Sequence, residues 1–406
     1  MTQRGIIFLL CFIFSSPMLF CTERIPSKKV LVSKIKILLD EEEVKSPTIL
    51  SYTKFRENKT FSQKAIQKEV ERTKIRLMNS GLFYSAQVEA HDSRKNPETI
   101  VIYISARTGF LLRFGGGNAY GFFGKVGLGG KRNMLAGYLG YNKTGASYID
   151  ENTFGLPLIF GAKFFTNAAQ SIAKKEPLAF DAYLKTGFFA GPDIRLGVDT
   201  RDQITVRENK PSLITISPYF YYTLLFSEKF IANAELRYFN NSSDDFKSDS
   251  IEAAINLDFN PNKKITLAGL LSGGAVIYSS EDAKINLEKT SIDLYDGLGL
   301  ANRGIRSGYT KEELETDSYG LFSAEIRWNA LDFNMPPAFP VTFAPYLFTD
   351  LALAQDYSAK DNRFLDAYGL GLLINFDCPV FAYFNLSYGI NHERKGKFVF
   401  AAMQSF

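Results

Sequence analysis

The chain has 406 residues, a formal net charge of +4 and an aromatic content of 14%, with 36 Phe and 21 Tyr. A charge this small gives no support to nucleic-acid binding. After the first 21 residues the sequence contains no apolar stretch long enough for a transmembrane helix, which argues against a helical membrane protein.

Residues 1–21 are predicted to be a signal peptide. Arg4 precedes an apolar run at residues 6–14, and small, turn-forming residues follow it, as in secretory leaders. The bulky Leu19 and Phe20 disfavour lipidation of Cys21, so we expect cleavage close to Cys21. Export, abundant Phe, Tyr and Gly, and only three Cys together favour an outer-membrane β-barrel over a soluble secreted enzyme.

Residues 22–108 are predicted to form a small periplasmic α+β domain. Alternating lysines indicate a strand at 30–39, and Ser46-Pro47 is typical of a helix start. A longer helix is expected to begin at Ser62 and to end at Gly81. Two strands at 84–91 and 99–106, joined by a polar turn, complete a β-α-α-β-β order. The residues expected on the buried face of the longer helix are Ile66, Val70, Thr73 and Leu77.

Residues 109–406 are predicted to form a transmembrane β-barrel. Apolar and polar residues alternate in segments of roughly ten residues, as in strands that separate lipid from a wet lumen. One such segment alone would also fit a soluble sandwich, but the number of segments and the signal peptide favour the barrel. At about nineteen residues for each strand with its connection, about sixteen antiparallel strands are expected. The clearest segments are 230–238, 251–259, 321–330 and 368–377.

The Gly-punctuated stretch 297–309 is the centre of the functional hypothesis. It carries two arginines and precedes the strand at 321–330, whose inward face contains Glu325. We expect this loop to fold into the lumen and to place Arg303 beside inward carboxylates.

The β-α-α-β-β order, with Ser80-Gly81-Leu82-Phe83 after the second helix, resembles a POTRA domain. The rest of the chain resembles the barrel of the BamA/TamA superfamily of outer-membrane assembly factors. Arg303-Gly304-Ile305 is similar to the arginine-glycine-aromatic motif of that family's sixth loop, with Ile305 replacing the aromatic residue. The other segments that carry the resemblance are 113–121, 127–129, 133–137, 325–328, 348–350, 368–372 and 376–379.

The resemblance implies a latch and a lateral gate. The latch would be Arg303, Gly304 and Ile305, with Arg303 paired to Glu325 or Asp350 inside the barrel. The gate would be the seam between the first and last barrel strands, where a client strand adds. Glycines make the first strand weak, although they could also only relieve crowding, and Ala402 and Gln404 depart from the usual aromatic ending. The predicted gate residues are Phe114, Gly115, Gly116, Gly117 and Gly121 in the first strand, and Phe398, Phe400 and Phe406 in the last.

No residue pattern in the sequence predicts catalysis, a cofactor or a metal. Gly130-Lys131 is followed by Arg132, so the phosphate-loop motif fails. The only two histidines, His91 and His392, lie in different modules. A Gly-x-Ser-x-Gly nucleophile elbow is also missing from the sequence.

The sequence therefore predicts a non-enzymatic factor of the BamA/TamA type in the bacterial outer membrane, with its N-terminal domain in the periplasm. Its expected partners are outer-membrane lipid and unfolded outer-membrane or secreted client proteins, with periplasmic chaperones or accessory subunits as further candidates. A two-partner-type secretion pore and a passive porin-like channel are the alternatives, and a lipid-handling role is neither supported nor excluded.

Overall fold

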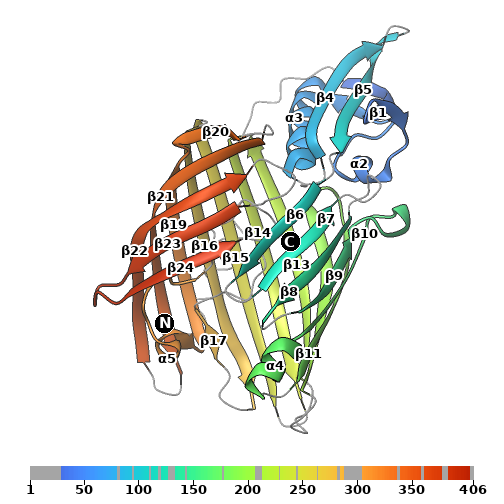
Figure 1. Ribbon diagram of the computed structural model, residues 1–406. Helices are drawn as coiled ribbons and strands as arrows, with labels where there is room; N and C mark the ends of the chain where they lie inside the picture. The colour runs from blue at the N-terminus through green and yellow to red at the C-terminus, as the bar shows by residue number, and fades with distance from the viewer. Residues whose placement is uncertain are drawn as a thin grey trace.

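The computed structural model comprises an N-terminal domain followed by a barrel (Figure 1). Among the described residues, helices long and apolar enough to cross a membrane are absent. The predicted signal peptide lies outside the described residues. The structure describes residues 29–79, 83–93, 96–108, 111–117, 120–126, 133–141, 144–175, 178–205, 213–227, 229–243, 246–262, 264–280, 284–287, 304–335, 339–357, 361–376 and 383–402.

The N-terminal domain is one sheet covered by helices. Its strands lie in the order β2-β1-β5-β4, with β1 and β5 parallel and the short β3 paired to β1. Along the chain the elements follow the predicted β-α-α-β-β order, with two short strands added and a longer final hairpin. The elements are β1 (Lys29–Leu39), β2 (Glu42–Val44), α2 (Pro47–Ser51), β3 (Thr60–Ser62), α3 (Gln63–Asn79), β4 (Phe83–Ser93) and β5 (Asn96–Thr108).

Local sequence signals explain both helices of this domain. The Ser46 side chain accepts a hydrogen bond from the Ile49 N–H at 3.2 Å, and Pro47 occupies the first turn of α2. At the start of α3, the Ser62 hydroxyl accepts from the Ala65 N–H at 3.2 Å. The α3 face predicted from the sequence packs on the sheet, with Thr73 and Leu77 fully buried.

The later strands, apart from β17 and β18, form one sheet that closes into a barrel. Strands β19 and β20 lie end to end along β21: residues 318–327 pair with 346–355, and residues 331–335 pair with 339–343. The strands are β6 (Leu111–Gly117), β7 (Tyr120–Val126), β8 (Asn133–Gly140), β9 (Thr144–Asp150), β10 (Leu158–Thr166), β11 (Ala179–Phe189), β12 (Ile194–Thr205), β13 (Leu213–Ser227), β14 (Phe230–Ser242), β15 (Lys247–Asn262), β16 (Ile265–Ser279), β19 (Ser318–Trp328), β20 (Leu331–Met335), β21 (Phe339–Asp356), β22 (Asp361–Phe376), β23 (Tyr383–Ile390) and β24 (Gly396–Ala402).

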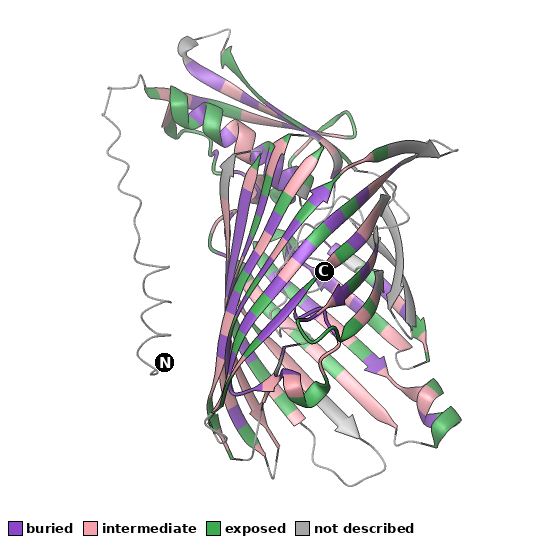
Figure 2. Ribbon diagram, turned by 90° about the vertical axis from the view of Figure 1, so that its left-hand side faces the viewer, coloured by how far each residue is buried: buried purple, intermediate pink, exposed green. Residues whose placement is uncertain are grey.

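Buried and exposed residues alternate along the strands (Figure 2). On β19 the outward Phe322, Ile326 and Trp328 are exposed, whereas the inward Ser323 and Glu325 are buried. An apolar outer surface around a charged interior is the arrangement that a lipid-facing barrel requires. The alternation is weak on β14, where Ala232 and Ala234 pair with larger neighbours and are buried although they face outward.

The connection from β16 to β19 is the long loop that the sequence analysis singled out. Its described part contains β17 (Ile285–Asn286), α5 (Lys311–Leu314) and β18 (Glu315–Thr316), and β17 pairs with β18. Leu287, Ile305 and Leu314 of the loop share one buried cluster with inward side chains of the wall, including Tyr319 and Phe348. The loop therefore lies inside the barrel.

Candidate functional site

Arg306 is the centre of the loop's contact with the barrel wall. It is 2% exposed, between the buried Ile305 and Ser307. Its Nε and Nη2 donate to the two Asp350 carboxylate oxygens at 2.9 and 2.7 Å, and its backbone N–H donates to Oδ2 at 3.1 Å. Its Nη1 donates to Glu325. Paired contacts of this kind between a guanidinium and carboxylates are strong and directional.

The wall presents these carboxylates because of strand register. Ser323 of β19 pairs with Asp350 of β21, so Glu325 lies two residues along the same inward face. Arg327 also faces inward and donates to Glu325 through Nε at 2.8 Å. Two buried guanidinium groups thus balance two buried carboxylates, as buried charges require.

Close approach of the loop to the wall depends on Gly389 of β23. A Cβ atom at this position would lie 1.9 Å from the backbone oxygen of Arg306, which is far inside van der Waals contact. The Phe348 ring lies against the arginine side chain, with its centroid 3.7 Å from the guanidinium carbon. The arginine is therefore enclosed by backbone, ring and carboxylates.

Beyond Arg306 the loop is attached to the last strands of the barrel. The Tyr309 hydroxyl donates to Asp366 of β22 at 3.0 Å, and the Gly308 N–H donates to the Lys395 carbonyl oxygen at 3.2 Å. Lys395 also pairs with Glu313 at 3.0 Å. Because Lys395 lies in the turn between β23 and β24, the loop contacts the hairpin that ends the barrel.

The attachment at this end of the loop is expected to weaken as pH rises. His392 Nδ1 lies 2.6 Å from Asp366 Oδ1, and this hydrogen bond, followed by the charges of Asp366 and Glu393, raises the pKa of His392 above its ordinary value of 6.5. Because the pKa is raised, the pair of protonated His392 with Asp366 contributes fully to stability below pH 6.5. This contribution is lost as the pH rises through the raised pKa. Hydrogen exchange of residues 304–316, corrected for the intrinsic pH effect, should show faster opening at pH 8.5 than at pH 5.5. In His392→Gln this difference should vanish; an equal difference in the variant would contradict the assignment.

The arginine predicted for this contact was Arg303, which lies outside the described residues. The contacts with Glu325 and Asp350 are made by Arg306, three residues later, while Gly304 and Ile305 are buried beside it. A signal for this was present in the sequence. Within 303–309, an aromatic residue follows a glycine only at Gly308-Tyr309, which favours the second arginine.

The predicted gate corresponds to the seam between β6 and β24, which are neighbours in the closed barrel. The described part of each of these strands has seven residues, whereas β15 and β22 have sixteen. Gly115, Gly116 and Gly117 lie on β6 with Phe114, but the assignment of Gly121 to the first strand is wrong. A turn after Gly117 places Gly121 on β7, paired with Gly116.

On the last strand, the predicted gate residues Phe398 and Phe400 both lie on β24, and Phe398 is exposed. Phe406 lies outside the described residues. The gate function of this seam remains a prediction.

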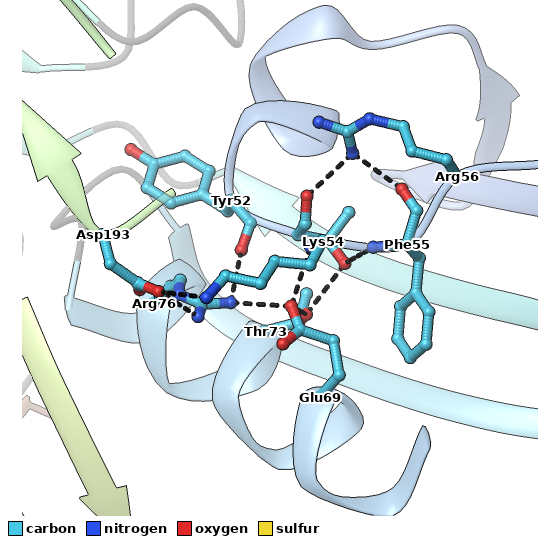
Figure 3. Close-up of polar contacts among 9 residues, drawn as sticks. Tyr52, Lys54, Phe55, Arg56, Glu69, Thr73, Arg76 and Asp193 are labelled. Atoms are coloured by element: carbon cyan, nitrogen blue, oxygen red, sulfur yellow. Dashed lines mark hydrogen bonds and ion pairs between the residues drawn. The ribbon is translucent and has the colours of Figure 1, made fainter. Parts of the chain in front are cut away.

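A second polar cluster joins the N-terminal domain to the barrel (Figure 3). Arg76 of α3 is buried and donates through Nε and Nη2 to Asp193, in the turn between β11 and β12, at 2.5 and 2.9 Å. Its Nη1 donates to Glu69 at 2.8 Å and to the Tyr52 carbonyl oxygen at 3.2 Å. Lys54 adds an ion pair with Asp193 at 2.8 Å.

Two further contacts support this junction. Asn152, in the turn between β9 and β10, donates to the Thr48 hydroxyl at 2.7 Å, and Ile75 packs on Ile231 of β14. No pattern in the sequence predicted this junction. The available signal was the pair Glu69 and Arg76, which are seven residues apart and lie beside the apolar face of the helix.

Neither cluster suggests a cofactor. Across the part of the chain that the structure describes, groups of three or more His, Cys, Asp or Glu side chains that could hold a metal ion are absent. Both clusters consist of charged groups that neutralise one another. Their arrangement suits mechanical attachment of a loop and of a domain.

Comparisons with known proteins identify the N-terminal domain. Residues 30–107 match the POTRA family model, described as the surface antigen variable number repeat. No curated protein matches the chain in sequence.

Among solved structures, CdiB from Acinetobacter baumannii has a TM-score of 0.53 at 11% identity, covering 92% of this chain and 73% of that one. CdiB from Escherichia coli has a TM-score of 0.52 at 10% identity, covering 92% and 76%. BamA from Haemophilus ducreyi, lacking POTRA domains 1–3, has 14% identity and covers 92% of this chain and 84% of its own. Its TM-score of 0.44 is too low to establish a shared fold.

Residues 30–107 therefore form a POTRA domain, and the chain shares its fold with CdiB. The prediction of a POTRA domain followed by a β-barrel is confirmed.

Proposed function

We propose that this chain, a POTRA domain joined to a CdiB-like barrel, is an outer-membrane factor that inserts or exports proteins without covalent chemistry. In this proposal the barrel has sixteen strand positions, with β19 and β20 sharing one, and the POTRA domain lies in the periplasm. Residues 1–21 would be the signal peptide, and the domain boundary would fall after residue 108.

The observation that carries the proposal is the loop held inside the barrel by Arg306. A passive channel needs an open lumen, and a buried arginine with two carboxylates is costly unless all its partners are satisfied. Here the loop is bound by Asp350 and Glu325 on one side and by the final hairpin on the other. A barrel whose interior is closed by its own loop is therefore favoured, and a porin-like channel is disfavoured.

Client capture would begin at the POTRA sheet. In the order β2-β1-β5-β4, the edge strand β4 has eleven residues, whereas β2 at the other edge has three. A long edge strand offers unpaired backbone groups to an extended peptide. We expect a client segment to pair with β4.

Insertion would then take place at the β6–β24 seam. Short strands, one of them rich in glycine, hold each other weakly and leave backbone groups available to a client strand. The loop contacts Gly389 and Lys395 of the last hairpin, so its position is coupled to one side of the seam. Release of Arg306 would therefore loosen the seam.

The second candidate is a two-partner-type secretion pore, which the fold shared with CdiB favours. The two functions differ in where the client ends. An inserted client becomes a membrane barrel, whereas an exported client crosses the membrane through the lumen.

Reconstitution tests this choice. Purified protein in liposomes would receive a urea-unfolded outer-membrane barrel protein from the POTRA side, and folding would be followed by heat-modifiable mobility. A disulfide across the seam, between a cysteine at Gly115, Gly116 or Gly117 and one at Phe398, in a chain with its native cysteines replaced by serine, should abolish folding until it is reduced. Equal folding with and without the disulfide would exclude insertion at the seam. Client protected inside the vesicles would instead support the secretion pore.

A further inference from the structure

The turn between β9 and β10 carries an unusually exposed aromatic side chain. It contains the short 3-10 helix η2 (Thr153–Gly155), in which Phe154 is 93% exposed, the highest value among the large apolar residues that the structure describes. Leu156 follows at 53% exposed. Figure 1 shows this turn, coloured green before β10, reaching outward at the barrel end that carries the POTRA domain.

The backbone of the turn holds Phe154 outward. Phe154 has φ 57° and Gly155 has φ 74°, so two consecutive residues adopt the left-handed conformation. This conformation is rare for a bulky residue, and local hydrogen bonds maintain it. The Asn152 N–H donates to Asp150 Oδ1 at 2.9 Å. The Gly155 N–H donates to the backbone carbonyl oxygen of Asn152 at 3.0 Å, and the Leu156 N–H to that of Thr153 at 3.1 Å.

The other side of the same turn contacts the POTRA domain. Asn152 is buried and donates to the Thr48 hydroxyl at 2.7 Å. A Cβ placed on Gly155 would lie 4.0 Å from the Pro47 ring, so the domain passes directly beside it. One rigid turn therefore contacts the POTRA domain and presents an aromatic ring away from the core.

The exposed residues of the turn continue the outer apolar surface of the barrel. Leu158 and Phe160 of β10 point outward, and Leu158 pairs with the exposed Phe188 of β11. Leu156 and Phe154 extend this surface past the end of the sheet, on the POTRA side. Aromatic residues at the end of an outward apolar band are typical of the lipid–water interface.

We propose that Phe154 and Leu156 insert into the membrane leaflet on the POTRA side, and that the turn thereby fixes the POTRA domain relative to the lipid surface. The ligand is the interfacial region of a phospholipid bilayer. The inference rests on the proposed function, because it requires the barrel to cross a membrane. It adds that domain orientation is set by lipid as well as by the Arg76 junction.

The single tryptophan of the chain makes the inference testable. Trp328 points outward from β19 and is exposed, so it reports lipid contact of the barrel itself. In Phe154→Trp with Trp328→Phe, the new indole is the only one. In liposomes of phosphatidylcholine brominated on its acyl chains, we expect its fluorescence to fall about twofold, as expected for an interfacial residue. In Lys34→Trp with Trp328→Phe, where the indole replaces an exposed POTRA side chain, the fluorescence should not change.

The wild-type chain separates the possible failures. If Trp328 is quenched but the indole at position 154 is not, membrane insertion of the turn is wrong and the barrel assignment stands. If neither is quenched, the barrel does not contact lipid, and the proposed function fails as well.

Spin labels test the effect on the POTRA domain. Labels on Lys34→Cys and Lys264→Cys would report the distance between the domain and a barrel turn on the same side, in a chain without other cysteines. Phe154→Asp should broaden this distance distribution in lipid nanodiscs and leave it unchanged in detergent. Ile172→Asp is the matched control, since Ile172 is 82% exposed on α4 (Ala168–Lys174), at the other end of β10. A distribution unchanged by Phe154→Asp would overturn the orienting role.

Discussion

Arg306→Ala is expected to release the loop from the barrel wall. The substitution leaves Asp350 and Glu325 buried, and among the described residues Arg327 is the cation that still pairs with Glu325. Removing one partner of a buried ion pair costs about 3–5 kcal/mol. Each 1.4 kcal/mol changes an equilibrium constant by about a factor of ten, so this cost is enough to shift the loop from bound to unbound in most molecules.

Two measurements on Arg306→Ala would show the release. The unheated barrel should lose its compact mobility in detergent gels, because the loop no longer joins β19 and β21 to the last hairpin. In planar bilayers the variant should conduct in large, noisy steps, whereas the wild type should be nearly silent. If both proteins show the same steady open conductance and the same gel mobility, the loop is not a latch. A passive channel is then the better interpretation.

Two further variants separate the charge from the position of the loop. Arg303→Ala removes the other arginine of the same stretch and should behave as wild type if Arg306 carries the contact. Gly389→Val leaves every charge in place but adds a Cβ atom that would lie only 1.9 Å from the Arg306 backbone oxygen, so the loop must move. It should reproduce the conductance of Arg306→Ala. A silent Gly389→Val channel would show that the loop can shift without opening the lumen.

The sequence predicted the parts of this site that depend on strand periodicity. Glu325 and Asp350 could be placed on the inward face because alternation by two fixes the face of every residue once one is known. The arginine that reaches them lies in a loop, where no period operates. Its identity depends on the close approach that Gly389 permits, and that residue is 83 positions away in the sequence.

The POTRA junction shows a different limit. Helix α3 could be recognised from its apolar face, and the helix starts from Ser46-Pro47 and Ser62. Arg76 has the same appearance in the sequence whether it is solvated or buried. Only the placement of the β11–β12 turn beside α3 gives it Asp193 as a partner, 117 residues later in the chain.

Asp193→Asn is expected to loosen the POTRA domain from the barrel. Burial raises the pKa of the Asp193 carboxyl, but the hydrogen bond and charge of Arg76, with those of Lys54, outweigh burial and lower the pKa overall. Because the pKa is lowered, ionised Asp193 contributes fully to docking of the POTRA domain at any pH above the ordinary value of 3.8. This contribution is lost only as the pH falls through the lowered pKa. Docking should therefore be intact at pH 7. The neutral variant should weaken it by about 3 kcal/mol, roughly a hundredfold, because Arg76 keeps Glu69 but loses its carboxylate partner on the barrel.

A cysteine pair at Thr48 and Asn152 would measure this docking, because the two side chains are in contact across the junction. Disulfide formation should be fast in the parent chain and slowed about a hundredfold by Asp193→Asn, by the same loss of a buried partner. Asp181→Asn is the matched control, since Asp181 pairs with Arg201 within the barrel wall. Arg76→Ala would be less informative, because it also leaves Glu69 buried inside the POTRA domain. If Asp193→Asn cross-links as fast as the control, the packing of Ile75 on Ile231 is enough to hold the domain, and the ion pair contributes little to docking.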